Sequence, residues 1–164
     1  MNPTSQTSQA EAILAAVLDR FAAQVAPGGT PGPAAPLSGV SVGPYLGLVQ
    51  GRKLPWLTVD LIGAARRRVT ADDGQVETRA TLDLTLADAA HGGHAALALA
   101  YRWAAWLESV LVPEGEAVPL DGLVDWIEPD AVAVHAGGAG FADFSVQARF
   151  ILRYRTPLGA PFTT

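Results

Sequence analysis

The sequence predicts an α+β fold, in which one mainly antiparallel sheet packs against two helices. Two observations support this prediction. Residues 54–87 alternate apolar and polar side chains on both sides of a turn, which is the pattern of a long β-hairpin. Residues 8–25 and 94–112 instead carry apolar side chains at helical spacing. With 164 residues, the chain is expected to form a single domain, 1–164.

Composition narrows the class of protein. The chain has no cysteine, which excludes disulfides and thiolate metal sites. Its formal charge of −5 argues against a protein whose main task is to coat nucleic acid. The polar residues 1–7 are expected to be flexible and lack the pattern of a signal peptide, and no segment is apolar enough to predict a membrane span.

The first helix is predicted to start at a capping box. Ser8 and Glu11 stand three residues apart, so each side chain can accept a hydrogen bond from a free backbone amide. One apolar stripe follows, formed by Ile13, Leu14, Val17, Leu18, Phe21 and Val25. Residues 27–44, rich in proline and glycine, are predicted to be a loop, either a flexible linker or a segment ordered by a neighbouring subunit. A short strand is expected at 45–49.

The hairpin is predicted to turn at 71–74, where Asp73-Gly74 supplies the positive φ. With Thr70 opposite Gln75, one face is apolar and the other mostly polar, and Arg68 lies opposite Glu77. The apolar face fades towards the turn. The base of the hairpin is therefore predicted to join the sheet, and its tip to project as an arm.

The second helix, 94–112, is apolar over much of its circumference, with Leu97 and Tyr101 on one side and Trp103 and Trp106 on another. Such a helix is covered on more than one face. The sheet is expected to cover one face. The first helix or a second subunit is expected to cover the other.

The last part of the chain is predicted to be strands. Short strands are expected at 123–127 and 131–135, separated by a turn at 128–130, and a long strand at 144–155 with strict alternation. Residues 156–164 contain two prolines and are expected to form an extended tail.

Catalytic and cofactor patterns are weak. His91 and His94, with Asp88, form the only cluster that resembles metal ligands, and no further ligand completes it. His135 is expected to be structural. The sequence contains no nucleophile elbow and no phosphate-binding loop. We therefore expect no cofactor, no metal and no enzymatic activity.

Basic and aromatic residues are better candidates for contacts with partners. Exposed arginine and tryptophan are common in protein interfaces, whereas a phosphate-binding role is disfavoured by the acidic total. A row of three arginines on the last strand could likewise bind phosphate or contact a protein: Arg149, Arg153 and Arg155. The candidate interface residues are Arg66, Arg67, Arg68, Asp72, Asp73, Glu77, Arg79, Trp103 and Trp106.

The element order resembles that of the tail terminator proteins of long-tailed bacteriophages, also called tail completion or tail-to-head joining proteins. The resemblance rests on the capped helix, the strand expected near Tyr45, the hairpin at 54–87, the tryptophan-containing helix and the closing strands, and covers residues 8–155. It implies a structural virion protein that forms a ring, usually a hexamer, at the head-proximal end of the tail tube. Such a ring ends tube growth and joins the tail to the head connector.

The resemblance also implies partners and a place. The partners are further copies of the chain, the tail tube protein and the neck or connector proteins, while DNA passes through the lumen without specific binding. The ring is assembled in the host cytoplasm and sits at the tail–neck junction of the virion. One alternative is another neck, connector or tail-tube-related subunit. A second is a small-ligand-binding or enzymatic α+β domain, with a pocket between the sheet and the second helix that uses His91, His94 or Tyr101.

Overall fold

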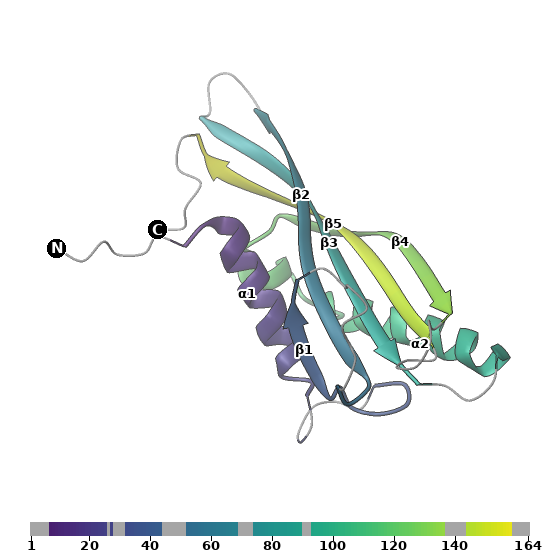
Figure 1. Cartoon of the computed structure of the whole chain (residues 1–164). Coiled ribbons are helices and arrows are strands. Elements are labelled where there is room, and N and C mark those ends of the chain that lie inside the picture. Colours follow the sequence, from purple (N-terminus) through teal and green to yellow (C-terminus); the bar gives the residue numbers. More distant parts are fainter. Residues whose placement is uncertain are drawn as a thin grey trace.

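The structure is a computed structural model that describes residues 7–25, 27, 32–43, 52–68, 74–89, 93–136 and 144–158. The strand predicted at 45–49 and the hairpin turn at 71–74, apart from Gly74, lie outside the described residues, as do residues 1–6 and 159–164. The elements, shown in Figure 1, are α1 (Gln9–Ala22), β1 (Gly39–Val42), β2 (Trp56–Arg68), β3 (Gln75–Asp88), α2 (Gly93–Leu111), the 3-10 helix η1 (Pro119–Gly122), β4 (Trp126–Ala136) and β5 (Phe144–Pro157).

The described strands form one five-stranded sheet in the order β1-β2-β3-β5-β4. β2, β3, β5 and β4 pair in antiparallel fashion, whereas β1 pairs with β2 in parallel. The α+β class is therefore correct, but the sheet is mixed. Residues 43–55 connect the parallel pair, and their length permits the chain to return to the same end of the sheet.

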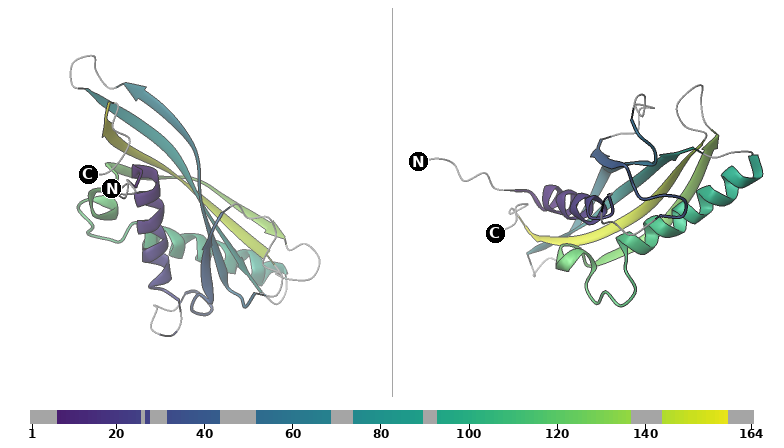
Figure 2. Two further views of the ribbon diagram at one scale, coloured as in Figure 1. Left: turned by 60° about the vertical axis from the view of Figure 1, so that its left-hand side comes forward. Right: turned by 90° about the horizontal axis from the view of Figure 1, so that it is seen from below.

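Both helices pack on one face of the sheet. α1 contacts β1 and β2, α2 contacts β5 and β4, and the two helices meet where the rings of Phe21 and Trp106 lie 6.3 Å apart. Figure 1 shows α1 beside β1, and α2 near the end of β4 and the start of β5; Figure 2 gives two further views. Their apolar side chains form one core with alternate residues of the strands, among them Val59, Leu84 and Phe150.

α1 begins where the capping box predicts. The Ser8 hydroxyl accepts a hydrogen bond from the Glu11 amide at 3.2 Å, and the Glu11 carboxylate accepts one from the Ser8 amide at 2.7 Å. This backbone donor lowers the pKa of Glu11. Ile13, Val17 and Phe21 are fully buried, which confirms the apolar stripe.

The segment 27–44 is not simply a loop. It contains strand β1, and Leu37, just before that strand, has no exposed surface. The Ser38 amide donates to the Pro55 carbonyl at 2.8 Å. The Trp56 ring lies against the backbone of Gly39, in the space that a larger side chain at this position would fill. The proline and glycine content hid a short strand that is stable because α1 and β2 cover it.

The hairpin has a different register from the predicted one. Arg67, not Arg68, lies opposite Glu77, and Arg68 lies opposite Val76. The register shifts between Ile62 and Ala64, where Gly63 has a φ of 62°. A glycine at positive φ is the usual residue of a β-bulge, which adds one residue to one strand. β5 pairs with β3 along its whole described length, with Pro157 opposite Gln75.

The closing strands correct another prediction. The expected pair of short strands is one strand, β4, with a register irregularity between Pro129 and Ala131 in place of a turn. Leu123 lies before this strand, next to η1. The alternation in β5 is confirmed. The residues of its apolar face are all buried, namely Phe144, Val146, Ala148, Phe150, Leu152 and Tyr154.

If Leu37 belongs to the core, Leu37→Ala should lower the free energy of unfolding by about 2–5 kcal/mol, since it removes a fully buried side chain. Denaturant unfolding measures this change. The matched control is Val42→Ala at the end of β1, where the side chain is 52% exposed and a change of about 0.5 kcal/mol or less is expected. Equal effects of the two substitutions would show that 27–44 does not contribute to the core.

Candidate interaction surface

The sequence-predicted interface residues separate into three groups. Arg66 and Arg79 are exposed, and Glu77 is half-buried, all near one end of the hairpin. Asp72 and Asp73 lie outside the described residues, as do the side chains of Arg67 and Arg68. Trp103 and Trp106 lie far along the chain, on α2. The structure therefore does not bring the tryptophans and the hairpin arginines into one site.

Trp103 belongs to the core of the subunit and is not a surface anchor. It has no exposed surface, and its ring meets that of Trp106 edge to face, with 5.2 Å between centroids. Its indole nitrogen donates to the buried Asp88 carboxylate at 2.8 Å, while the Ala89 amide donates to the other oxygen. The prediction that Trp103 contacts a partner is thus wrong, because the ring is buried inside the subunit, where it packs α2 on the sheet.

The sheet face away from the helices carries a polar network. The buried Asp83 accepts hydrogen bonds from Gln147 at 2.7 Å and from Arg149 at 2.8 and 2.9 Å. These contacts raise the pKa of Arg149. Asp60 lies opposite Asp83 in the register, and burial, followed by the charge of Asp83, raises the pKa of Asp60.

The arginine row of β5 is matched by acids. Besides Arg149 with Asp83, Arg153 lies 3.3 Å from Glu128 and Arg155 lies 3.8 Å from Asp125. Each of these arginines therefore has a carboxylate partner within the chain. This pairing leaves the row poorly suited to gather phosphate groups, for which unpaired cations are needed.

A groove lies between α2 and the edge strand β4. It contains a hollow of about 330 Å³, lined by Ala104, Ala105, Glu108, Pro129, Asp130, Ala131, Val132, Ala148, Arg149 and Phe150. Large apolar side chains beside it face solvent: Leu97 is 48% exposed, Tyr101 57% and Val132 49%. Val132 lies opposite Ala148, so it points to the helix side of the sheet, but α2 does not cover it.

This groove was not among the predicted site residues. The signal in the sequence was the wide apolar circumference of the second helix. Trp106, Leu99 and Val110 are partly buried against the core, but Leu97 and Tyr101 have no such cover. Glu108, Pro129 and Asp130 gave no signal, because only the fold places β4 beside this helix.

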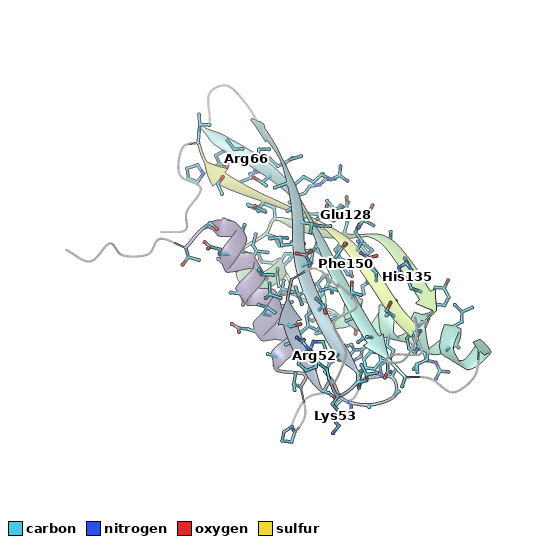
Figure 3. The ribbon with its side chains drawn as sticks, viewed as in Figure 1. Arg52, Lys53, Arg66, Glu128, His135 and Phe150 are labelled. Carbon is cyan, nitrogen blue, oxygen red and sulfur yellow. The ribbon has the colours of Figure 1, made fainter. Side chains whose placement is uncertain are left out.

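The candidate metal cluster lies mostly outside the described part of the chain, which leaves out His91 and the His94 side chain. Its third member, Asp88, accepts a hydrogen bond from Trp103. Among the described residues, no group of three or more histidines and acids is placed to hold a metal ion. His135 is exposed on β4, as Figure 3 shows.

Comparison with known proteins adds no family. No protein-family model matches the chain, and neither does any curated protein. Within the described residues, no helix has the length and apolar character needed to cross a membrane.

The contribution of the hydrogen bond between Trp103 and Asp88 to stability can be measured by removing the indole donor. Trp103→Phe is expected to lower the free energy of unfolding by about 2 kcal/mol or more, because it leaves a buried carboxylate without one hydrogen bond and creates space in the core. Thermal and denaturant unfolding measure this loss. The control is Trp126→Phe, since the exposed Trp126 donates to Glu128 at the surface, and little change is expected there. Similar losses in both variants would contradict the assignment.

The raised pKa of Asp60 predicts a dependence of stability on pH. Burial disfavours the ionised carboxylate in the folded state, so the contribution of Asp60 to stability should fall as pH rises from the ordinary value of 3.8 through the raised pKa. Asp60→Asn removes this penalty. Its melting temperature should exceed that of the wild type at neutral pH, and the difference should shrink below pH 3.8. Glu114→Gln, in an exposed turn, serves as the control, and a pH-independent difference for Asp60→Asn would contradict this account.

Proposed function

We propose that this protein is a structural subunit that assembles as a homo-oligomeric ring, a hexamer, at the head-proximal end of a bacteriophage tail tube. In this role it ends tube growth and joins the tail to the head connector. Its partners are further copies of itself, the tail tube protein and the neck proteins, and its place is the virion. Assembly of such a ring depends on surfaces that bind other subunits and does not require a catalytic group.

The observation that carries the proposal is the apolar surface left open by α2 and β4. Three large side chains are about half exposed: Val132, which lines the hollow, and Leu97 and Tyr101, which precede the lining residue Ala105 on the same face of α2. Contiguous exposed apolar surface of this kind marks a protein contact. The sequence predicted that a second subunit is one of two possible covers for the second helix, and α1 covers only the side that bears Trp106.

The end of the hairpin supports the same role. Ala64, Ala65 and Arg66 of β2 are exposed, and Figure 1 shows β2, β3 and β5 continuing past α1. We interpret this end as the arm that reaches a neighbouring subunit or the tube. The net charge of −5 also suits a channel through which DNA slides without sticking, because like charges weaken binding to phosphate.

Another neck or tail-tube-related subunit would use the same surfaces, since ring proteins of one fold differ chiefly in their partners. The other class, a small-ligand-binding domain, is favoured by the hollow between α2 and the sheet. Its volume of about 330 Å³ is at the lower end for ligand sites, and the predicted ligand contacts, His91 and the His94 side chain, lie outside the described residues. Tyr101 stands exposed beside it.

The proposal is tested by the mass of the protein in solution. Light scattering over a range of concentrations, with negative-stain images, should give rings, either alone or after addition of tail tube protein. The same protein added to growing tubes should limit their length. A strict monomer that neither forms rings nor binds tube protein would overturn the proposal and favour the ligand-binding class.

A single charged residue at the exposed end of β2 should separate folding from assembly. Ala65→Glu is expected to leave the free energy of unfolding within about 0.5 kcal/mol of the wild type, because the site is exposed, but to weaken self-association at least tenfold. Unfolding curves and light scattering measure the two effects. Ala15→Glu, on the exposed face of α1 and on neither surface, is the matched control and should assemble normally. Equal assembly of both variants would contradict the arm role.

A further inference from the structure

We propose that the groove between α2 and β4 receives the exposed end of β2 from a second copy of this chain. The contact is then head to tail, with two different surfaces meeting at every junction. This inference rests on the proposed ring function and names the two surfaces that build the ring. It commits to one occupant, a second copy, because the two surfaces carry opposite charges.

The receiving surface is acidic and apolar. Glu108 of α2 and Asp130 of β4 both line the hollow, whose floor is made by small or apolar side chains such as Ala104 and Ala148. The groove also contains Arg149, but the guanidinium of this residue donates to Asp83 through two nitrogens. Glu108 makes no ion pair with any residue that the structure describes. The groove therefore has an acidic rim that suits a cationic side chain with an apolar stem.

The backbone of β4 opposes simple addition of another strand. The pairing register with β5 is irregular between Pro129 and Ala131, and Pro129 has no amide hydrogen to donate. Bulges and prolines are the usual devices that protect a sheet edge from strand addition. A partner is therefore received by side chains that enter the hollow beside Asp130, rather than by extension of the sheet.

The inserting surface is basic, with small side chains. β1 pairs with β2 only as far as Val59, so in the described part of the chain the outer edge of β2 has no partner from Asp60 onward. There Ile62 is 37% exposed, and Ala64, Ala65 and Arg66 follow it on the surface. Two exposed arginines lie at this end of the described strands, Arg66 on β2 and Arg79 on β3, opposite Ala65. This end of β2 can approach a groove closely and offers the opposite charge.

The topology places the two surfaces apart. β4 is one edge strand of the sheet, and β2 lies near the other edge, beside β1. Figure 3 shows Arg66 at one extremity of the molecule and His135, on β4, well away from it. One copy therefore cannot close the contact on itself. A contact between different surfaces of successive copies is heterologous, and it closes into a ring when the rotation between copies permits.

The test uses the absence of cysteine in this chain. Two single variants are made, Ala65→Cys at the end of β2 and Ala105→Cys in the groove, and both positions are exposed. Under mild oxidation, disulfide-linked dimers are expected when the two variants are mixed, at least fivefold more than with either variant alone. The double variant, Ala65→Cys with Ala105→Cys, should give a ladder of linked species that ends at the ring size. A mixture of Ala65→Cys with Ala15→Cys, at an exposed position on α1, controls for random collision.

The outcomes separate this inference from the proposed function. Linked dimers formed equally by Ala105→Cys alone would show a symmetric contact and overturn the inference. Absence of specific linkage, while light scattering and images show rings of the wild type, would overturn the inference and leave the ring function intact. Absence of linkage together with a strict monomer, alone and with tube protein, would overturn both.

Discussion

The structure depends on the long uninterrupted pairing of β3 with β5. These strands pair from Gln75 with Pro157 to Asp88 with Phe144, without any register shift. β2 flanks β3 and β4 flanks β5, so the two long strands hold together the halves of the sheet on which α1, at β1 and β2, and α2, at β5 and β4, pack. Irregularities occur only in the outer partners, at Gly63 of β2 and around Pro129 of β4. The sheet is therefore regular at its centre and deformed on both sides of it.

The helices do not cover this long sheet completely, and the uncovered parts are the candidate interaction surfaces. Trp103 fixes α2 on the sheet through the buried contact with Asp88, and Phe21 and Trp106 join the two helices. With α2 held in this position, the inner face of β4 extends beyond it, and Val132 remains half exposed. At the far end of the sheet, β2 continues past β1 with short side chains and then arginines. Both open surfaces thus follow from strands that are longer than their cover.

Local signals in the sequence were sufficient for much of the fold. The capping box of α1, the alternation in β5 and the apolar spacing of α2 depend on neighbours within a few residues, and all three predictions are confirmed. The parallel strand β1 was missed because its stability comes from β2 and α1 and not from its own glycine-rich sequence. Pro129 suggested a turn, but an edge strand tolerates proline when the missing amide would face outward.

The site was harder to predict than the fold, for a physical reason. The groove is formed by α2, β4 and β5, and no spacing in the sequence indicates that Glu108 and Asp130 line one hollow. What the sequence did contain was a surplus: the second helix has more apolar surface than one sheet face can bury. Once Trp103 and Trp106 are assigned to the core, that surplus reduces to Leu97 and Tyr101, which share a face of α2 with the groove residue Ala105. These exposed side chains, together with the exposed strand end, are the observations on which the proposed contact with a second copy rests.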